Sequence, residues 1–388
     1  MAIDGQLPDP PNASVASVTL AQAGAVLEID LGAIAANWRS LSARHPSGPV
    51  AGVVKADAYG LGAAAVVPAL RAAGCRHFFV AHLSEALAIR DLAPGCLLGV
   101  LNGPIPGTEA DYVAENLTPV LGSLAEIDAW AAQARLAGRK LSAILHVDTG
   151  MARLGLDAPG LAALRDDPSR LDGIALEYVM THLVASETPD DPANEAQRGK
   201  FAAACAGLAP APRSLANSSG IFLGPGWGSD LARPGAALYG INPTPAATNP
   251  MRPVVRLRAR VLSVRQIPAG ASVGYNGIWT ASRPSRIATA AIGYADGWHR
   301  RQSGNGSGNG SGNGQAVFDG RPVPLVGRVS MDLTTFDATD HPAIQPGAWL
   351  ELIGPNRSAD DVAAAGGTNG YEVLTSLGRR FCRVYAAS

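Results

Sequence analysis

Between about residue 50 and residue 240, short apolar segments alternate with longer amphipathic ones, and this alternation constrains the fold more than any other feature. The intervening stretches, such as SEALAIRDL and LAEIDAWAAQARLAG, have helical periodicity. Repeated strand–helix alternation predicts an α/β fold with a parallel sheet, and eight repeats in roughly 200 residues match a closed (β/α)8, TIM-like barrel. A doubly wound open sheet is the alternative, weakened because no GxGxxG turn follows the first strand. The candidate strands are VAGVVK, HFFVAH, LLGVL, LTPVL, LSAILHV, IALEYVMTH, RSLANS and LARPGAALYG.

After Pro243 the pattern changes to β-rich segments punctuated by Gly and Pro, among them VRLRARVLSVRQI and PVPLVGRVSMDLTTFDA. We therefore expect an N-terminal tail at 1–24, the barrel at 25–243, and a mostly-β C-terminal domain at 244–388 that is closed by a helix near 371–380. Within that domain, residues 303–314 repeat SGNG three times. This segment has no apolar side chain to bury and predicts a flexible surface loop.

The composition fits a globular protein with a large core, because 47% of the 388 residues are hydrophobic and only 16% are charged. The net charge of −1 gives no electrostatic reason to expect nucleic acid or an anionic membrane as a partner. No apolar run has the length of a membrane span, and the first residues lack a signal-peptide pattern. The four cysteines are scattered without CxxC spacing, so we expect reduced packing residues, no metal site, and a cytoplasmic location.

Polar residues follow several candidate strands, at the end of a barrel where catalytic groups gather. Lys55 ends the first strand, where burial would lower its pKa and leave a neutral amine for a Schiff base. Each residue also has an ordinary alternative: a snorkelling lysine, an Arg153–Asp148 ion pair, a hydrogen-bonded core histidine. The residues that follow the later strands occur together at successive strand ends, and this joint occurrence favours a functional site. Besides Lys55, these residues are Arg153, His182, Asn217, Ser218, Arg233 and Gly235.

The motif around Lys55, VVKADAYGLG, resembles the lysine motif of the alanine racemase family, which depends on pyridoxal 5'-phosphate. The resemblance runs through essentially the whole chain, in the same order and spacing. It includes LEIDLGAIAANW, VDTGMARLG, THL, NSSG, RPGAALYG, VGYN, IGYADGW, GRVSMD and YEVLTSLGRRF.

The resemblance implies two catalytic bases on opposite faces of the substrate. Lys55 would carry the cofactor and act as one base, and Tyr275 of the partner subunit would be the other. A phenol is a poor base at neutral pH, and the resemblance implies that His182, hydrogen-bonded to Arg233, favours the phenolate. Arg233 would also face the pyridine nitrogen, and because arginine does not give up its proton, that nitrogen would stay unprotonated.

The remaining roles follow from the same resemblance. Hydroxyls and backbone N–H groups would hold the cofactor, and Arg153 with the backbone near Met331 of the partner subunit would bind the carboxylate of alanine. A homodimer with composite active sites follows. The cofactor set adds Tyr59, Asn217, Ser218, Gly235, Ala236 and Tyr371 to Lys55, His182 and Arg233, while Asp332, Arg328 and Tyr294 would line the corridor to the site.

His146 departs from the family pattern, which places a lysine, often carbamylated, two residues before the aspartate of DTGM. An imidazole forms no stable carbamate, so we expect a neutral His146 and another anion near Arg153, chloride being one candidate.

Several other functions share parts of this pattern. Decarboxylases and small cofactor-homeostasis proteins share the barrel and its lysine. The C-terminal domain argues against the cofactor-homeostasis proteins, and Arg233 with Tyr275 argues against the decarboxylases. A serine or broad-specificity racemase of the same fold stays open, and a non-catalytic binding protein is disfavoured by the two bases. The expected role is L- and D-alanine interconversion, supplying D-alanine for peptidoglycan or alanine catabolism.

Overall fold

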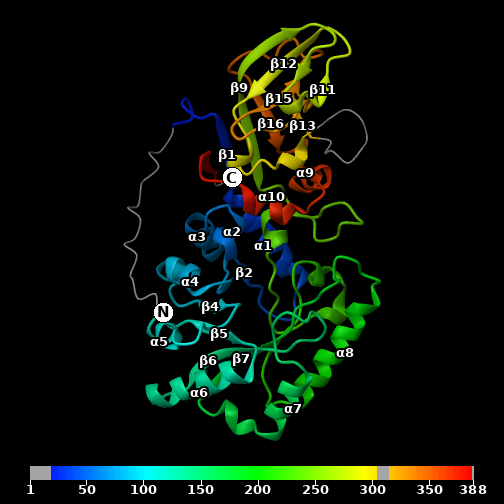
Figure 1. The fold of residues 1–388 in the computed structure, drawn as a ribbon. Helices are drawn as coiled ribbons and strands as arrows, with labels where there is room; N and C mark the ends of the chain where they lie inside the picture. Colours follow the sequence, from blue (N-terminus) through cyan, green and yellow to red (C-terminus); the bar gives the residue numbers. More distant parts are fainter. Residues whose placement is uncertain (1–18, 304–313, 387–388) are drawn as a thin grey trace.

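The computed structural model describes residues 19–303 and 314–386. Figure 1 shows the barrel with its outer helices α6, α7 and α8 at one end and a β domain at the other, with α1, α2 and α10 between them. Most of the expected tail (1–24) and of the SGNG segment (303–314) lies outside the described residues. Among the described helices, none is long and apolar enough to cross a membrane.

The barrel is built on seven parallel strands that pair in chain order. An eighth position is filled by residues 231–234, which are too short for a named strand but bridge to both edges: Leu231 pairs with Ser214 and Ala232 with Val50. This closure confirms the predicted TIM-like barrel. The strands are β2 (Gly52–Val53), β3 (His77–Val80), β4 (Leu97–Val100), β5 (Thr118–Leu121), β6 (Leu141–His146), β7 (Ile174–Met180) and β8 (Arg213–Ser214).

Helices follow the strands and begin where the sequence supplies caps. Ser123 and Glu126 form a capping box at the start of α6, and the Asp157 side chain accepts a hydrogen bond from the Gly160 N–H at the start of α7. The helices are α1 (Leu31–Arg44), α2 (Lys55–Tyr59), α3 (Ala63–Ala73), α4 (Leu83–Ile89), α5 (Glu109–Ala114), α6 (Leu124–Ala137), α7 (Ala158–Asp166) and α8 (Pro192–Ala206).

The second domain is organised around β9 (Val255–Ile267), the longest strand, which pairs with β1 (Ala25–Asp30), β12 (Ser285–Ala290) and β16 (Trp349–Ile353). The mostly-β expectation is confirmed. Strand β1, which the expected boundary at residue 25 assigns to the barrel, lies in this sheet instead, between β9 and β17. The other elements of the second domain are β10 (Ser272–Val273), β11 (Trp279–Thr280), β13 (Gln315–Phe318), β14 (Arg321–Pro324), β15 (Thr334–Asp337), β17 (Cys382–Ala386), α9 (Ala359–Gly366) and α10 (Gly370–Ser376).

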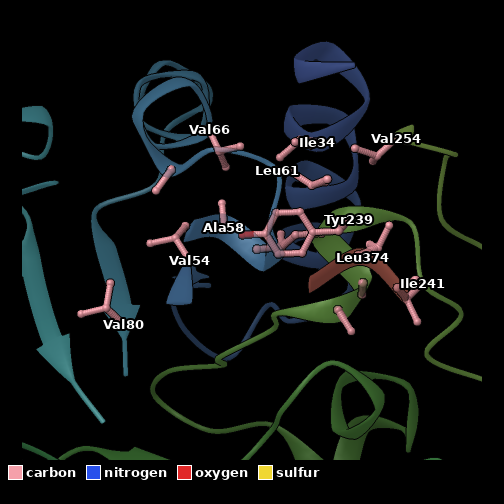
Figure 2. Close-up of a cluster of buried hydrophobic side chains, with 14 of the residues drawn as sticks. Ile34, Val54, Ala58, Leu61, Val66, Val80, Tyr239, Ile241, Val254 and Leu374 are labelled. Atoms are coloured by element: carbon pink, nitrogen blue, oxygen red, sulfur yellow. The ribbon is translucent and has the colours of Figure 1, made fainter. Parts of the chain in front are cut away.

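The two domains share a hydrophobic core. Figure 2 shows Ile34 of α1 and Ala58 of α2 near the ring of Tyr239, with Leu374 of α10 and Val254 at the edge of the cluster. All five side chains are buried, so the junction excludes water and helps fix where α2 and α10 lie at the barrel mouth.

Candidate active site

Lys55 stands at the start of a left-handed turn. Ala56, Asp57, Ala58 and Tyr59 have φ of 54°, 53°, 55° and 56°, although none is glycine. This conformation costs roughly 1–2 kcal/mol per residue. Acidic side chains hold the turn: Glu85 accepts from the Ala56 N–H at 2.5 Å and Asp57 from the Ala63 N–H at 2.7 Å. Backbone strain of this kind gathers at functional sites, and it is the first local evidence that Lys55 belongs to one.

A cavity of about 410 Å³ opens at this end of the barrel. It brings together every predicted site residue of the barrel with one residue of α10, Tyr371. Segments spread over more than 300 positions therefore converge on one space. The predicted residues that line it are Lys55, Tyr59, Arg153, His182, Asn217, Ser218, Arg233, Gly235, Ala236 and Tyr371.

Arg233 is the buried cation of the cavity. Its guanidinium donates to the Thr181 carbonyl at 2.6 Å and to the Ser214 hydroxyl. Burial lowers its pKa to about 10, which leaves it charged at neutral pH. The expected hydrogen bond to His182 is not formed among the described residues, because the guanidinium is turned toward Thr181 and Ser214. That expectation was wrong.

The two histidines of the site are neutral. Burial, followed by the nearby charges of Arg233 and Arg153, lowers the pKa of His182 to about 3. Burial and then Arg233 lower the pKa of His146 to about 4, in agreement with the neutral imidazole expected there. Neither ring can act as a cation at physiological pH, so each contributes hydrogen bonding alone.

Lys55 and Arg153 face the same cavity. Burial first, and the Arg153 charge second, lower the Lys55 pKa, with Glu85 opposing. The ion pair between Arg153 and Asp148 is not formed, because Asp148 accepts the N–H groups of Gly150 and Met151 at 2.9 and 2.8 Å. Among the described residues Arg153 has no hydrogen-bond partner, so its guanidinium is open to an anionic ligand.

A second cavity of about 190 Å³ is also lined by Arg153. It is lined by His146 and also by Glu126, whose carboxylate accepts the Gly122 N–H at 2.6 Å. Nothing in the sequence assigns Glu126 to a functional site, because its role in the capping box of α6 accounts for a glutamate at this position. It is a carboxylate in the same cavity as His146 and Arg153.

Three hydroxyls and a close backbone approach make a cradle for an anion. The Ser218 hydroxyl accepts the N–H groups of Gly235 and Ala237 at 3.0 and 3.2 Å, so its own proton is left to donate outward. Burial raises the pKa of Tyr59 to about 12, which keeps it protonated. A Cβ at Gly235 would lie 2.2 Å from the Tyr59 oxygen, so any larger residue would force the Tyr59 side chain to move. These neutral donors suit a phosphate.

Tyr371 is the third hydroxyl of the cradle, but its proton is already donated in a hydrogen bond. Its hydroxyl donates to the carboxylate of Glu187, a residue of the loop after β7 that also lines the cavity. Sequence reasoning missed Glu187 because an exposed loop carboxylate has no distinguishing pattern.

The two other residues predicted for catalysis and substrate binding, Tyr275 and Met331, lie outside the cavity. Both belong to the C-terminal domain, and their side chains are 64% and 53% exposed. Their loops are neighbours, since a Cβ at Gly327 would lie 2.8 Å from the Val273 carbonyl. Within one chain, the structure does not bring them to Lys55.

Comparison with known proteins agrees with this geometry. Residues 29–243 match the family model of the alanine racemase N-terminal domain, and residues 254–385 match that of the C-terminal domain. The chain is 58% identical to alanine racemase of Acidiphilium cryptum over 358 residues, which cover 92% of this chain and 98% of that protein. It is 49% identical to a catabolic alanine racemase of Mesorhizobium japonicum, with 95% of each chain covered.

A solved structure gives the same result. Alanine racemase from Bartonella henselae, which holds covalently bound pyridoxal phosphate, superposes with a TM-score of 0.89 at 40% identity. The match covers 94% of this chain and all of that one. With both domains matched, and with a lysine at the start of a strained turn in the same cavity as the hydroxyl cradle, the chain belongs to the alanine racemase family.

Proposed function

We propose that this protein interconverts L- and D-alanine with pyridoxal 5'-phosphate held on Lys55, and that its active site is completed by a second subunit. The observation that carries the proposal is the position of Lys55: a half-buried amine with a lowered pKa, presented by a strained turn into a cavity with a phosphate cradle. A neutral amine is the form that reacts with a carbonyl.

The residues that line the cavity suit the charges of the cofactor. Tyr59, Ser218, Tyr371 and the backbone at Ala236 would hold the phosphate, beside Gly235, whose own N–H donates to Ser218, and with Asn217 alongside. Arg233 would donate to the ring nitrogen, because a charged guanidinium has no lone pair with which to accept a proton. When bound, the cofactor would withdraw electrons from the Cα–H bond of alanine and make that proton removable.

Racemisation requires proton transfer on both faces of the substrate carbon. Lys55 would take or return the proton on one face, and the partner subunit's Tyr275 on the other. Tyr275 is exposed and is not among the residues that line the cavity, which supports a role in a neighbouring site. His182 would orient that phenol by a hydrogen bond.

The alanine carboxylate would lie between the two subunits. Arg153 supplies a guanidinium that has no hydrogen-bond partner within residues 19–303 and 314–386, and its planar fork matches a carboxylate. The partner subunit's Met331 would supply a backbone N–H. Because both groups are needed, the homodimer would be the active species.

The proposed role is to supply D-alanine for peptidoglycan or to degrade alanine. All four cysteines are free, which supports a cytoplasmic location.

Reduction with borohydride tests the cofactor site. We expect the purified protein to show an absorbance near that of a lysine-bound pyridoxal, which borohydride bleaches, leaving the label on Lys55 alone. Label on another lysine, or no cofactor in wild-type protein, would refute the assignment.

Complementation tests the shared site. Lys55→Ala and Tyr275→Ala homodimers should each be nearly inactive, whereas their heterodimer contains one site with both bases. Activity should return when the two are mixed and reassociated. A mixture that forms heterodimers and stays inactive would rule out subunit sharing.

A further inference from the structure

Arg380, close to the C-terminal end of the described chain, is bound to two carboxylates at once. Its Nε donates to Asp296 at 2.7 Å and its terminal nitrogen to Asp332 at 2.8 Å. Asp296 is buried, and it also accepts the Gly293 N–H at 2.9 Å. A planar fork can hold two carboxylates in fixed positions, which an ammonium group does poorly.

The two carboxylates belong to segments that are already joined through their backbones. The N–H groups of Tyr294 and Ala295 donate to the carbonyls of Ser330 and Met331, at 3.0 and 2.9 Å. The turn at 330–332 therefore rests on the turn at 294–296, and Arg380 ties both to the segment before β17. Among the described residues the Met331 N–H has no partner, while the carbonyl of the same residue is engaged.

We propose that Arg380 is a positioning residue that, through Asp332, aims the Met331 N–H at the carboxylate of alanine in the neighbouring subunit's site. This inference rests on the proposed function, in which Met331 serves a shared site. Arg380 touches no reacting atom and acts through the turn alone.

The expected signature is a rise in KM with little change in kcat, because a carboxylate contact is made equally in the ground state and the transition state. Asp332→Ala should raise the KM for both enantiomers about tenfold, since small misplacements of binding groups have large effects. Arg380→Lys, which keeps a charge beside Asp296, should raise it less. Arg379→Ala, at the exposed neighbouring arginine, is the control and should leave KM unchanged.

A double variant separates positioning from any direct effect of the Asp332 charge on the corridor. If Arg380 works through Asp332, adding Arg380→Lys to Asp332→Ala should raise KM no further. Additive effects, or a wild-type KM in Asp332→Ala protein, would overturn the proposal. So would a fall in kcat without a change in KM.

Heterodimers with differently tagged subunits show which site the turn serves. In the first, one subunit carries Lys55→Ala and the other Asp332→Ala, so the only active lysine meets an intact turn from its partner, and KM should be that of the wild type. In the second, both changes are on one subunit and the other is wild type, so the active lysine meets the altered turn and KM should rise.

The two hypotheses fail differently in this experiment. The reverse pattern, with the raised KM in the first heterodimer, would refute the shared site and leave Arg380 as a positioning residue within one chain. Equal KM values in both heterodimers would overturn the positioning role itself.

Discussion

The phenol of Tyr371 donates its hydrogen bond to the carboxylate of Glu187, across the boundary between α10 and the loop after β7. A phenol has one proton to donate, so a phosphate in the cradle has to compete with Glu187 for it. The carboxylate also repels a phosphate dianion. Burial and Glu187 together raise the Tyr371 pKa, which keeps the donor protonated.

Glu187→Gln should therefore strengthen cofactor binding. We expect the Kd of the apo-protein for pyridoxal phosphate to fall about fivefold, equivalent to about 1 kcal/mol. Fluorescence titration measures it, and inorganic phosphate should compete more strongly in the variant. Asp190→Asn, at an exposed carboxylate of the same loop, is the control. Unchanged or weaker binding in Glu187→Gln would contradict the competition.

Gly235→Ala should open the cradle. The new methyl group would lie 2.2 Å from the Tyr59 oxygen, so the ring would have to move away from its stack on Tyr239. We expect the cofactor Kd to rise by about tenfold or more, a loss of at least about 1.4 kcal/mol. Gly199→Ala, in α8 with no neighbour near the added carbon, is the matched control and should leave the Kd unchanged. Equal affinities would show that Tyr59 is not part of the cradle.

Acid should destabilise the fold through the two neutral histidines. In the unfolded chain a histidine titrates near pH 6.5, whereas burial lowers the pKa of His182 to about 3 and of His146 to about 4. Between about pH 4 and 6.5 the unfolded state binds more protons, so stability rises with pH by about 1.4 kcal/mol per unit for each histidine. His146→Gln should remove about one proton from the difference between the unfolded and folded states, and so lower the pH dependence of the unfolding free energy by about 1.4 kcal/mol per pH unit. Denaturant titrations at several pH values measure this dependence. An unchanged slope would mean that His146 is protonated in the fold.

His146→Lys should make activity depend on bicarbonate. A lysine here could form a carbamate beside Arg153, whereas the natural imidazole cannot. We expect carbon dioxide removal to lower the activity of the variant and to leave the parent unaffected. Replacing chloride should raise the parent's KM only if chloride, rather than Glu126, serves as the anion near Arg153. A parent that loses activity without carbon dioxide would show that some other lysine is carbamylated.

Residues 304–313 should be replaceable by a short turn without loss of stability or activity. The residues that flank them are tied to the domain: the Ser303 hydroxyl accepts the Val329 N–H at 3.0 Å, and the Leu325 N–H donates to the Gly314 carbonyl at 2.9 Å. Calorimetry should show a Tm within about 1–2 °C of the parent, as expected for a polar, glycine-rich loop. Ser303→Ala is the contrast and should lower the Tm.

The barrel was predictable because strand–helix alternation is a local pattern, repeated along the chain. The pairing of β1 with β17 was not, since it joins segments some 350 residues apart with nothing local to indicate a partner. The presence or absence of a local signal also explains why Lys55 and Arg233 were predicted whereas Glu187 and Arg380 were not. A residue at a strand end carries a positional signal, whereas Glu187, in an exposed loop, and Arg380, before β17, acquire their partners only in the folded chain. No local pattern indicated the left-handed geometry of the KADAY segment, which is held by the hydrogen bonds that Glu85 accepts from the Ala56 N–H and Asp57 from the Ala63 N–H.

That left-handed turn also bears on how the molecule opens. Four L-residues held at positive φ amount to roughly 4–8 kcal/mol of conformational strain, comparable with the net stability of many whole domains. Such a segment persists only while its surroundings hold it, so the amides of 56–59 should exchange with solvent at a lower opening free energy than those of β6 or β7. A ligand fixed to Lys55 binds only the closed arrangement and would raise that opening free energy by mass action. The free energy of this local opening and, under the proposed function, the presentation of the Lys55 amine are therefore set by the same five residues.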